Sequence, residues 1–178
     1  MAVDTIPLER PFNLGNLGRV GAEIVVTPPA AELKRLAHWA GVSEVESFNA
    51  TVSLKRLSST RFSYDAELEA KIVQDCVVTL QAVRSVLSRR IHRDLHLADR
   101  THAPGSKEVV VDPTSPDDDV REEIASPRYD LAGPLLEELV LAIDPYPRAP
   151  GVAFQASPET EAVRTNPFAV LKNLNKQE

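Results

Sequence analysis

Histidines and a single cysteine are the residues of this chain best suited to catalysis or metal binding. His92 and His96 are four residues apart, the spacing at which two imidazoles on a helix converge on one zinc ion. Arg93 stands where a zinc protease has its glutamate, and no cysteine is near enough in sequence to complete a zinc site. The sequence therefore predicts no metal centre and no cofactor.

Nucleophilic catalysis is not indicated either. No Gly-x-Ser-x-Gly elbow occurs, and the acidic residues gather in a polar segment rather than as an isolated pair in apolar surroundings. The single cysteine, Cys76, excludes an internal disulfide, and its apolar neighbours predict a buried strand residue rather than a reactive thiol. We therefore predict that the chain is not an enzyme.

Charge is unevenly distributed along the chain. The 178 residues carry a net charge of -6, and residues 108–125 alone hold seven acidic residues and one arginine, which accounts for the whole excess. Within this segment, Asp117, Asp118 and Asp119 are candidates for binding a basic protein. A hydrophobic content of 43% suffices for one substantial core, so residues 1–178 are predicted to form one domain.

Clustered cations form the candidate nucleic-acid site. Neutralising several phosphates requires grouped arginines or lysines, and the candidate RNA contacts are Lys55, Arg56, Arg84, Arg89, Arg90 and Arg93. Aromatic stacking on bases is not indicated, because Phe62 and Tyr64 nearby have the parity of core residues. The alternative interpretation of these cations is a solvated basic edge paired with the acidic segment.

Hydrophobic periodicity predicts the main elements. A short strand at 21–26 is followed by a helix that begins after Pro28 and Pro29 and ends at Gly41. Apolar residues then alternate with polar ones at 47–54 and 61–72, which predicts two long antiparallel strands with one solvated face. The parity slips at Val73, so a bulge or bend is expected near Gln74 and Asp75. Residues 83–97 fit a helix or a strand.

The C-terminal half alternates between polar segments and helical patterns. Residues 101–127 and 148–165 are predicted to be flexible, apart from a short strand at 109–111. A helix is expected to begin near Gly133, with Pro134 in its first turn and an apolar face; that face comprises Leu135, Leu136, Leu139, Val140 and Ile143. Glu137 points away from this face. Asn166 is expected to cap a short C-terminal helix.

Several segments together resemble the YceD family, which is linked to the accumulation of large-subunit (23S) ribosomal RNA. The resemblance rests on an Arg10-Pro11 opening, the strands from Phe48 to Leu80, and two C-terminal motifs. The motif residues are Cys76, Asp130, Leu131, Glu137, Asp144, Pro145, Tyr146, Pro147, Asn166, Pro167 and Phe168. Gly133 and Pro134 depart from the family pattern, as does Thr79, where other branches carry a second cysteine.

The resemblance implies a fold and a function. We expect an α+β fold: a curved antiparallel sheet packed by two helices, with an acidic flexible loop and a short C-terminal helix. The matching family segment looks extended, so residues 83–97 are predicted to be a strand. The implied function is that of a non-enzymatic factor in large-subunit biogenesis, which binds precursor 23S rRNA or an early ribosomal protein; Glu137 is a further protein-binding candidate. The rival hypothesis is a protein- or small-molecule-binding module unrelated to RNA.

The first residues and the hydropathy bear on the expected location. Asp4, Pro7 and Glu9 stand where a signal peptide has its apolar run, and no stretch approaches the ~20 apolar residues of a membrane span. A soluble, cytoplasmic protein without a membrane partner is therefore expected. The oligomeric state does not follow from the sequence.

Overall fold

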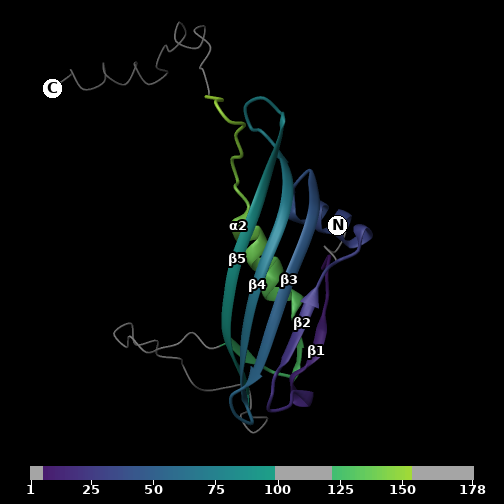
Figure 1. The fold of residues 1–178 in the computed structure, drawn as a ribbon, viewed down its shortest axis with the longest axis vertical. Helices are drawn as coiled ribbons and strands as arrows, with labels where there is room; N and C mark the ends of the chain where they lie inside the picture. Colours follow the sequence, from purple (N-terminus) through teal and green to yellow (C-terminus); the bar gives the residue numbers. More distant parts are fainter. Residues whose placement is uncertain (1–5, 99–121, 154–178) are drawn as a thin grey trace, which may run out of the picture.

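A five-stranded sheet forms the centre of the computed structural model, which describes residues 6–98 and 122–153 (Figure 1). The strand order is β2-β3-β4-β5-β6, with all neighbours antiparallel except β5 and β6, and a separate ribbon pairs β1 with β7. The elements are β1 (Pro11–Asn13), the 3-10 turn η1 (Leu14–Asn16), β2 (Ala22–Val26), α1 (Ala30–Ala40), β3 (Glu44–Arg56), β4 (Arg61–Asp75), β5 (Ala82–Leu97), β6 (Glu122–Ile124), β7 (Arg128–Asp130) and α2 (Ala132–Ala142). The predicted α+β fold with a sheet packed by two helices is confirmed.

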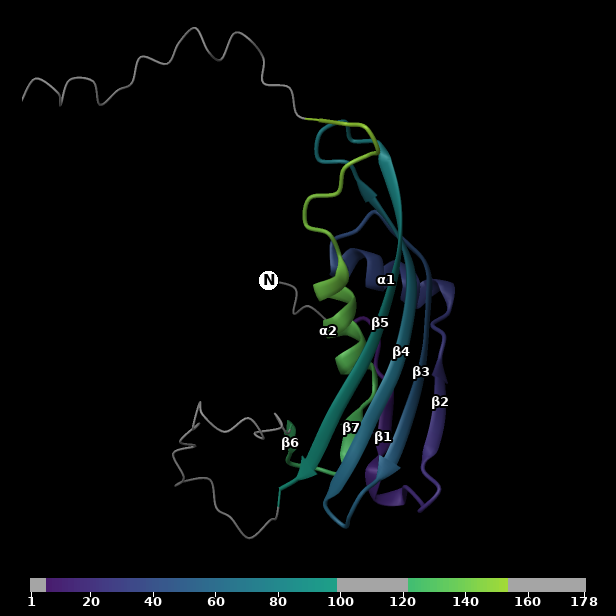
Figure 2. The ribbon, with the colours of Figure 1, turned by 60° about the vertical axis from the view of Figure 1, so that its left-hand side comes forward.

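One face of the sheet carries the core. Every second residue of β3 and β4 is buried, from Phe48 to Leu54 and from Phe62 to Ile72, while the residues between them are mostly exposed or half-buried. Figure 2 shows the sheet curving around α2, β1 and β7, which lie on its concave side. The predicted hairpin with one solvated face is therefore confirmed, and within the described residues no element covers the opposite, convex face.

The segment that fitted both a helix and a strand is β5. Its residues from Ala82 to His96 pair with β4 in one unbroken register, from Asp75↔Ala82 to Arg61↔His96, so the predicted strand is confirmed. Ile91 and Leu95 of β5 are buried against the core. Because β4 is itself amphipathic, the ladder selects the two-residue period of β5 over its four-residue period.

The two helices begin and end close to their predicted limits. Gly41 caps α1 in a left-handed conformation (φ 69°), and its N–H donates to carbonyls of the last turn. Pro134 lies in the first turn of α2, where a proline leaves no intrahelical bond unmade. Val140 was assigned to the apolar face of α2, but its side chain is 43% exposed. It lies about 100° around the helix from buried Leu139, beyond the contact with the sheet.

The sequence predicts a bulge or bend near Gln74 and Asp75. No bulge occurs there, because β4 keeps its register with β5 as far as Asp75, and the chain turns shortly after it, at residues 77–79. β4 simply ends at Asp75, and the irregularity lies in the partner strand, between Val45 and Ser47. Gln74 interrupts the alternation of apolar and polar residues, because it is a polar residue on the buried face of the strand. Its side-chain amide donates to the carbonyl of Asp144, 2.9 Å away. Cys76 is buried as predicted, but it opens a turn closed by the Leu80 N–H and is not part of a strand.

The strand β6 and the β1–β7 ribbon are too short to be recognised from the periodicity of the sequence. β6 lies at the end of the acidic segment expected to be flexible, and it pairs with residues 95–97 of β5. The β1–β7 ribbon joins residues more than a hundred positions apart. The predicted strand at 109–111 and the C-terminal helix at Asn166 lie outside the described residues. None of the helices in the described ranges is long and apolar enough to cross a membrane.

Candidate functional surface

Alternation along β5 divides the predicted RNA-binding arginines between two faces. Arg89 and Arg93 lie opposite buried residues of β4, on the concave side, whereas Arg84 and Arg90 share the parity of the convex side. Side chains on opposite faces of a sheet cannot contact one stretch of backbone phosphates together. These four arginines therefore do not form one patch.

The two arginines on the convex face have acidic partners. Arg84 Nε lies 3.0 Å from a carboxylate oxygen of Glu46, and Arg90 Nε lies 3.1 Å from one of Glu67. Both arginines are highly exposed, with 73% and 88% of their side chains accessible. Such surface pairs contribute little to stability, but the carboxylates offset the positive potential that would attract RNA.

Arg93 links three elements on the other side. Its guanidinium contacts Glu122 of β6 at 3.3 Å and Glu137 of α2 at 2.5 Å, and its side chain is only 27% exposed. Burial lowers the pKa of Arg93, but hydrogen bonds and charge from Glu137 and Glu122 outweigh this effect and raise it overall. Glu137, a predicted protein contact, therefore holds α2 to the sheet through Arg93.

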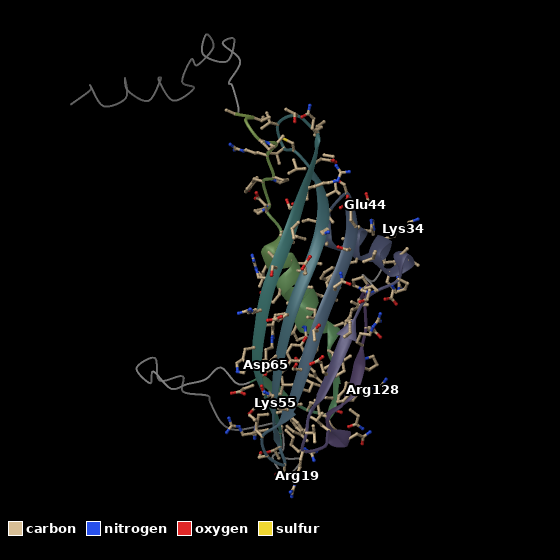
Figure 3. All side chains as sticks on the ribbon, in the orientation of Figure 1. Arg19, Lys34, Glu44, Lys55, Asp65 and Arg128 are labelled. Carbon is tan, nitrogen blue, oxygen red and sulfur yellow. The ribbon has the colours of Figure 1, made fainter. Side chains whose placement is uncertain are left out.

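The remaining cations are separated as well. Arg56 donates to the carbonyls of Leu14 and Gly15 at 3.4 and 3.2 Å, and its guanidinium lies 5.5 Å from the ring centre of Phe62. Lys55 is exposed on the convex face, at the lower end of the sheet in Figure 3. Among the six predicted cations, Arg56, Lys55 and Arg89 have no ion pair within the part of the chain that the structure describes.

A groove of about 650 Å³ follows the edge of β5. It is lined by Arg90, Ile91, His92, Arg93, Asp94, Glu122 and Glu138. Five consecutive strand residues alternate between the two faces, so the groove must run along the backbone edge of β5 rather than across either face. Asp94, Glu122 and Glu138 have no sequence signal as site residues, because only the packing of α2 and β6 beside β5 brings them together. The predicted contacts Asp117, Asp118 and Asp119 lie outside the described residues.

The Asp130-Leu131 part of the first C-terminal motif forms a joint, a set of hydrogen bonds that connects the Arg10 segment, the sheet and the start of α2. The Asp130 carboxylate accepts hydrogen bonds from the N–H groups of Arg10 and Ala132, at 2.7 and 3.1 Å. Leu131 N–H donates to the Arg10 carbonyl at 3.0 Å, and the buried Tyr64 hydroxyl donates to the Leu131 carbonyl at 2.9 Å. The Arg10 opening and the Asp130-Leu131 motif therefore meet at one place, where they fix the start of α2 over the sheet.

The Asp144-Pro145-Tyr146-Pro147 part of the same motif lies over the end of β4. Gln74 donates to the Asp144 carbonyl at 2.9 Å, and Val77 N–H donates to the Pro147 carbonyl at 2.9 Å. The Asp144 side chain accepts the N–H of Tyr146, whose ring is 71% exposed. Pro145 lies within this turn, whereas Asn166, Pro167 and Phe168 lie outside the described residues. These contacts give the segment at 144–147 a structural role.

Cys76 contacts the chain just after this segment, at Ala149. Its sulfur accepts a hydrogen bond from Ala149 N–H at 3.3 Å, and the residue is 0% exposed. Hydrogen bonds, first from the Thr79 hydroxyl and then from the Ala149 backbone, lower the pKa of the Cys76 thiol to about 6.

We expect Cys76 to titrate well below an ordinary thiol. Thiolate absorbance at 240 nm should rise with a midpoint near pH 6, and Thr79→Val should raise that midpoint because it removes the largest cause. Since the pKa is lower in the folded protein, this group should add stability as pH rises from about 6 toward the unfolded thiol value of ~8.5. A midpoint above pH 8 in the parent protein would contradict the hydrogen-bonded sulfur.

A polar cluster on the convex face contains His92, one of the two histidines with zinc-ligand spacing in the sequence. His92 Nδ1 lies 2.6 Å from Asp65, and the Ser63 hydroxyl donates to the same carboxylate at 2.7 Å. Although burial raises the pKa of Asp65, the hydrogen bonds from Ser63 and His92 lower it overall. Ser63 is thus bonded to the acid rather than to the imidazole, which is not a nucleophile–base geometry.

Metal binding by the histidine pair finds no support in the geometry. His92 and His96 are on a strand, where four residues span ~13 Å rather than one helical turn. No group of three metal-ligating side chains occurs among the described residues.

Comparison with known proteins gives no relative for this chain. Neither a family model, nor a curated protein, nor a solved structure matches it. The resemblance to the YceD family therefore rests on the sequence motifs alone.

Proposed function

We propose that this protein is a cytoplasmic, non-enzymatic factor in large ribosomal subunit biogenesis that supports 23S rRNA accumulation by binding an early, basic ribosomal protein. The family assignment comes from the sequence motifs. The observation that carries the choice of partner is the acidic surroundings of the predicted basic strip, the β5 arginines Arg84, Arg89, Arg90 and Arg93. Arg84, Arg90 and Arg93 each face a carboxylate, and the edge groove adds Glu138, which has no ion pair within the described residues.

A protein partner fits this charge distribution better than RNA does. Phosphates bind where cations are clustered and unneutralised, and the affinity grows with each counterion released. The carboxylate of Glu138 in the groove, the net charge of -6 and the acidic segment at 108–125 instead favour a basic protein and speed its association. Holding such a protein before it meets RNA would raise the yield of large subunits, and no catalysis is needed for this role.

Loss of the protein should reduce large subunits relative to small ones. In a deletion strain we expect sucrose gradients to show fewer 50S particles, and total RNA to show a lower ratio of 23S to 16S rRNA, because assembly lacks its chaperone. Expression from a plasmid should restore both ratios. Unchanged ratios at normal and low growth temperature would favour a binding module unrelated to RNA.

The direct partner can be identified with purified components. Tagged protein should retain one or more isolated large-subunit proteins, and it should bind a protein-free 23S rRNA fragment poorly. If the RNA fragment alone is retained, and Arg84, Arg89, Arg90 and Arg93→Ser abolishes this, the basic strip is the contact site and the protein-binding proposal is wrong.

A further inference from the structure

One backbone edge of β5 is largely free. The strand runs from Ala82 to Leu97, but β6 pairs only with residues 95–97. For residues 82–94, no strand lies on that side within the described ranges, and Figure 1 shows β5 as the outer strand over this length. The outward N–H and C=O groups of such an edge are a template for another strand.

The groove lies on this edge where a continuing strand would lie. Residues 90–94 of β5 form its floor, Glu122 of β6 marks one end, and Glu138 of α2 forms a side. β6 already pairs with the next three residues of β5, so a peptide in the groove would lie in line with β6 and extend the same sheet row. This arrangement fits strand addition, in which main-chain bonds give affinity and alternate side chains give specificity.

The charges of the groove favour a basic occupant. Its lining has two arginines and three acids. Both arginines are engaged by carboxylates, Arg90 by Glu67 and Arg93 by Glu122 and Glu137, and Asp94 is paired with Arg61 at 3.9 Å. Glu138 has no ion pair within the described residues and remains available to a lysine or arginine.

An apolar contact lies beside the acids. Leu141 is 77% exposed and follows Glu137 and Glu138 by one helical turn, so it lies on the same side of α2. A strand added to β5 would place alternate side chains on the concave side, toward α2, and the others on the convex side. A segment that alternates basic and apolar residues would therefore meet both kinds of contact.

A second copy of this chain fits the same edge poorly. Antiparallel pairing of two β5 strands about a two-fold axis at Arg89 or Arg90 places that arginine opposite itself. An axis at Ile91 places Arg89 opposite Arg93. Like charges directly opposite each other destabilise a strand pair. The arginines thus disfavour these self-pairings, as charged residues on natural edge strands do.

We propose that residues 88–94 of β5, together with Glu138 of α2, bind an extended basic segment of a partner protein by strand addition. The inference deepens the proposed function and rests on it only for the identity of the partner as a ribosomal protein. The binding site itself is defined by the free edge, the groove and the carboxylate of Glu138, which has no ion pair within the described residues.

The test uses a synthetic heptapeptide of alternating lysine and valine, labelled with fluorescein, and the full-length protein. Fluorescence polarisation should show saturable binding that weakens with salt, whereas a peptide with glutamate in place of lysine should bind roughly tenfold more weakly, equivalent to about 1.4 kcal/mol. A lysine–valine peptide methylated on alternate backbone nitrogens should also bind poorly, because it cannot complete the ladder.

Matched protein variants locate the site. Glu138→Lys should weaken the binding of the lysine–valine peptide. Glu69→Lys makes the same charge change on the convex face of β4 and should leave peptide binding nearly unchanged. Hydrogen exchange should show that alternate amides within residues 88–94 become protected when peptide is added. Equal effects of the two variants, or tight binding of the methylated peptide, would overturn the proposal.

Occupation of the edge without peptide is a separate outcome. If residues 88–94 are already protected in the protein alone, the edge is filled by its own chain or by a second copy, and the proposal is wrong; light scattering distinguishes these two cases. If the peptide does not bind but the deletion strain has fewer large subunits, the ribosomal partner binds another surface of the protein. If the peptide binds but the subunit ratios of the deletion strain are unchanged, the binding site is supported and its partner is not a ribosomal protein.

Discussion

Leu139→Ala is expected to lower the free energy of unfolding by ~2–5 kcal/mol, the range for truncating a leucine in a packed core. Leu139 is 0% exposed and lies one helical turn after Leu135 and Leu136, which are also buried. The substitution removes apolar contacts and leaves a cavity that the rigid sheet cannot fill. Urea unfolding should show a lower midpoint with an unchanged slope, since the surface exposed on unfolding changes little.

The next residue provides a matched control. Val140→Ala truncates an aliphatic side chain on the same helix, but Val140 is 43% exposed, so its loss should cost well under ~1 kcal/mol. Glu137→Ala should also be mild, because the carboxylate is 59% exposed and such ion pairs contribute ~0–1 kcal/mol. If Leu139→Ala is as stable as Val140→Ala and impairs subunit assembly, this face of α2 is a docking surface and not core.

Local periodicity was sufficient to predict the strands and helices that contain most of the core. In β3 and β4 the alternation of Phe48 to Leu54 and Phe62 to Ile72 already defines the buried face. Gly41 and Pro134 indicate helix ends through backbone geometry that depends on single residues. Residues 83–97 satisfied two periods, and only pairing with an amphipathic neighbour strand decides between them.

Contacts between residues far apart in the sequence do not follow from local periodicity. Neither the bulge at Val45 nor the end of β4 at Asp75 follows from local pattern. The burial of the polar residue Gln74 likewise depends on a partner, Asp144, that lies 70 residues further along the chain. The three residues of β6 give too little periodicity to be recognised. The same limit applied to the candidate site: proximity in sequence suggested a single basic strip, whereas strand alternation divides it.

The acid partners of the strip come from distant parts of the chain. Arg93 contacts Glu122 and Glu137, which lie on elements 29 and 44 residues further along. Only the folded arrangement of α2 and β6 beside β5 determines that these charges compensate one another. A basic cluster read from sequence is therefore a weak predictor of RNA binding when acidic segments follow it, and the net potential of the folded surface decides.

The joint at Asp130 should be the most sensitive polar site in the fold. Asp130→Ala removes the acceptor of the Arg10 and Ala132 N–H groups, and a buried donor left without a partner costs ~1–3 kcal/mol. The loss should propagate to α2, because these bonds fix the residue that begins it and hold Leu131 where Tyr64 donates to its carbonyl. Hydrogen exchange should show faster opening of β1 and of the first turn of α2.

Two variants separate the hydrogen bonds from charge and from general turn effects. Asp130→Asn keeps an acceptor oxygen and should recover most of the stability lost in Asp130→Ala, since neutral acceptors form weaker but adequate bonds. Asp144→Ala removes the acceptor of the exposed Tyr146 N–H and should be milder, because water can replace that bond. If Asp130→Ala and Asp144→Ala unfold at the same urea concentration, the Asp130 carboxylate does not hold the two segments together, and the packing of Leu131 and Tyr64 alone must fix α2 on the sheet.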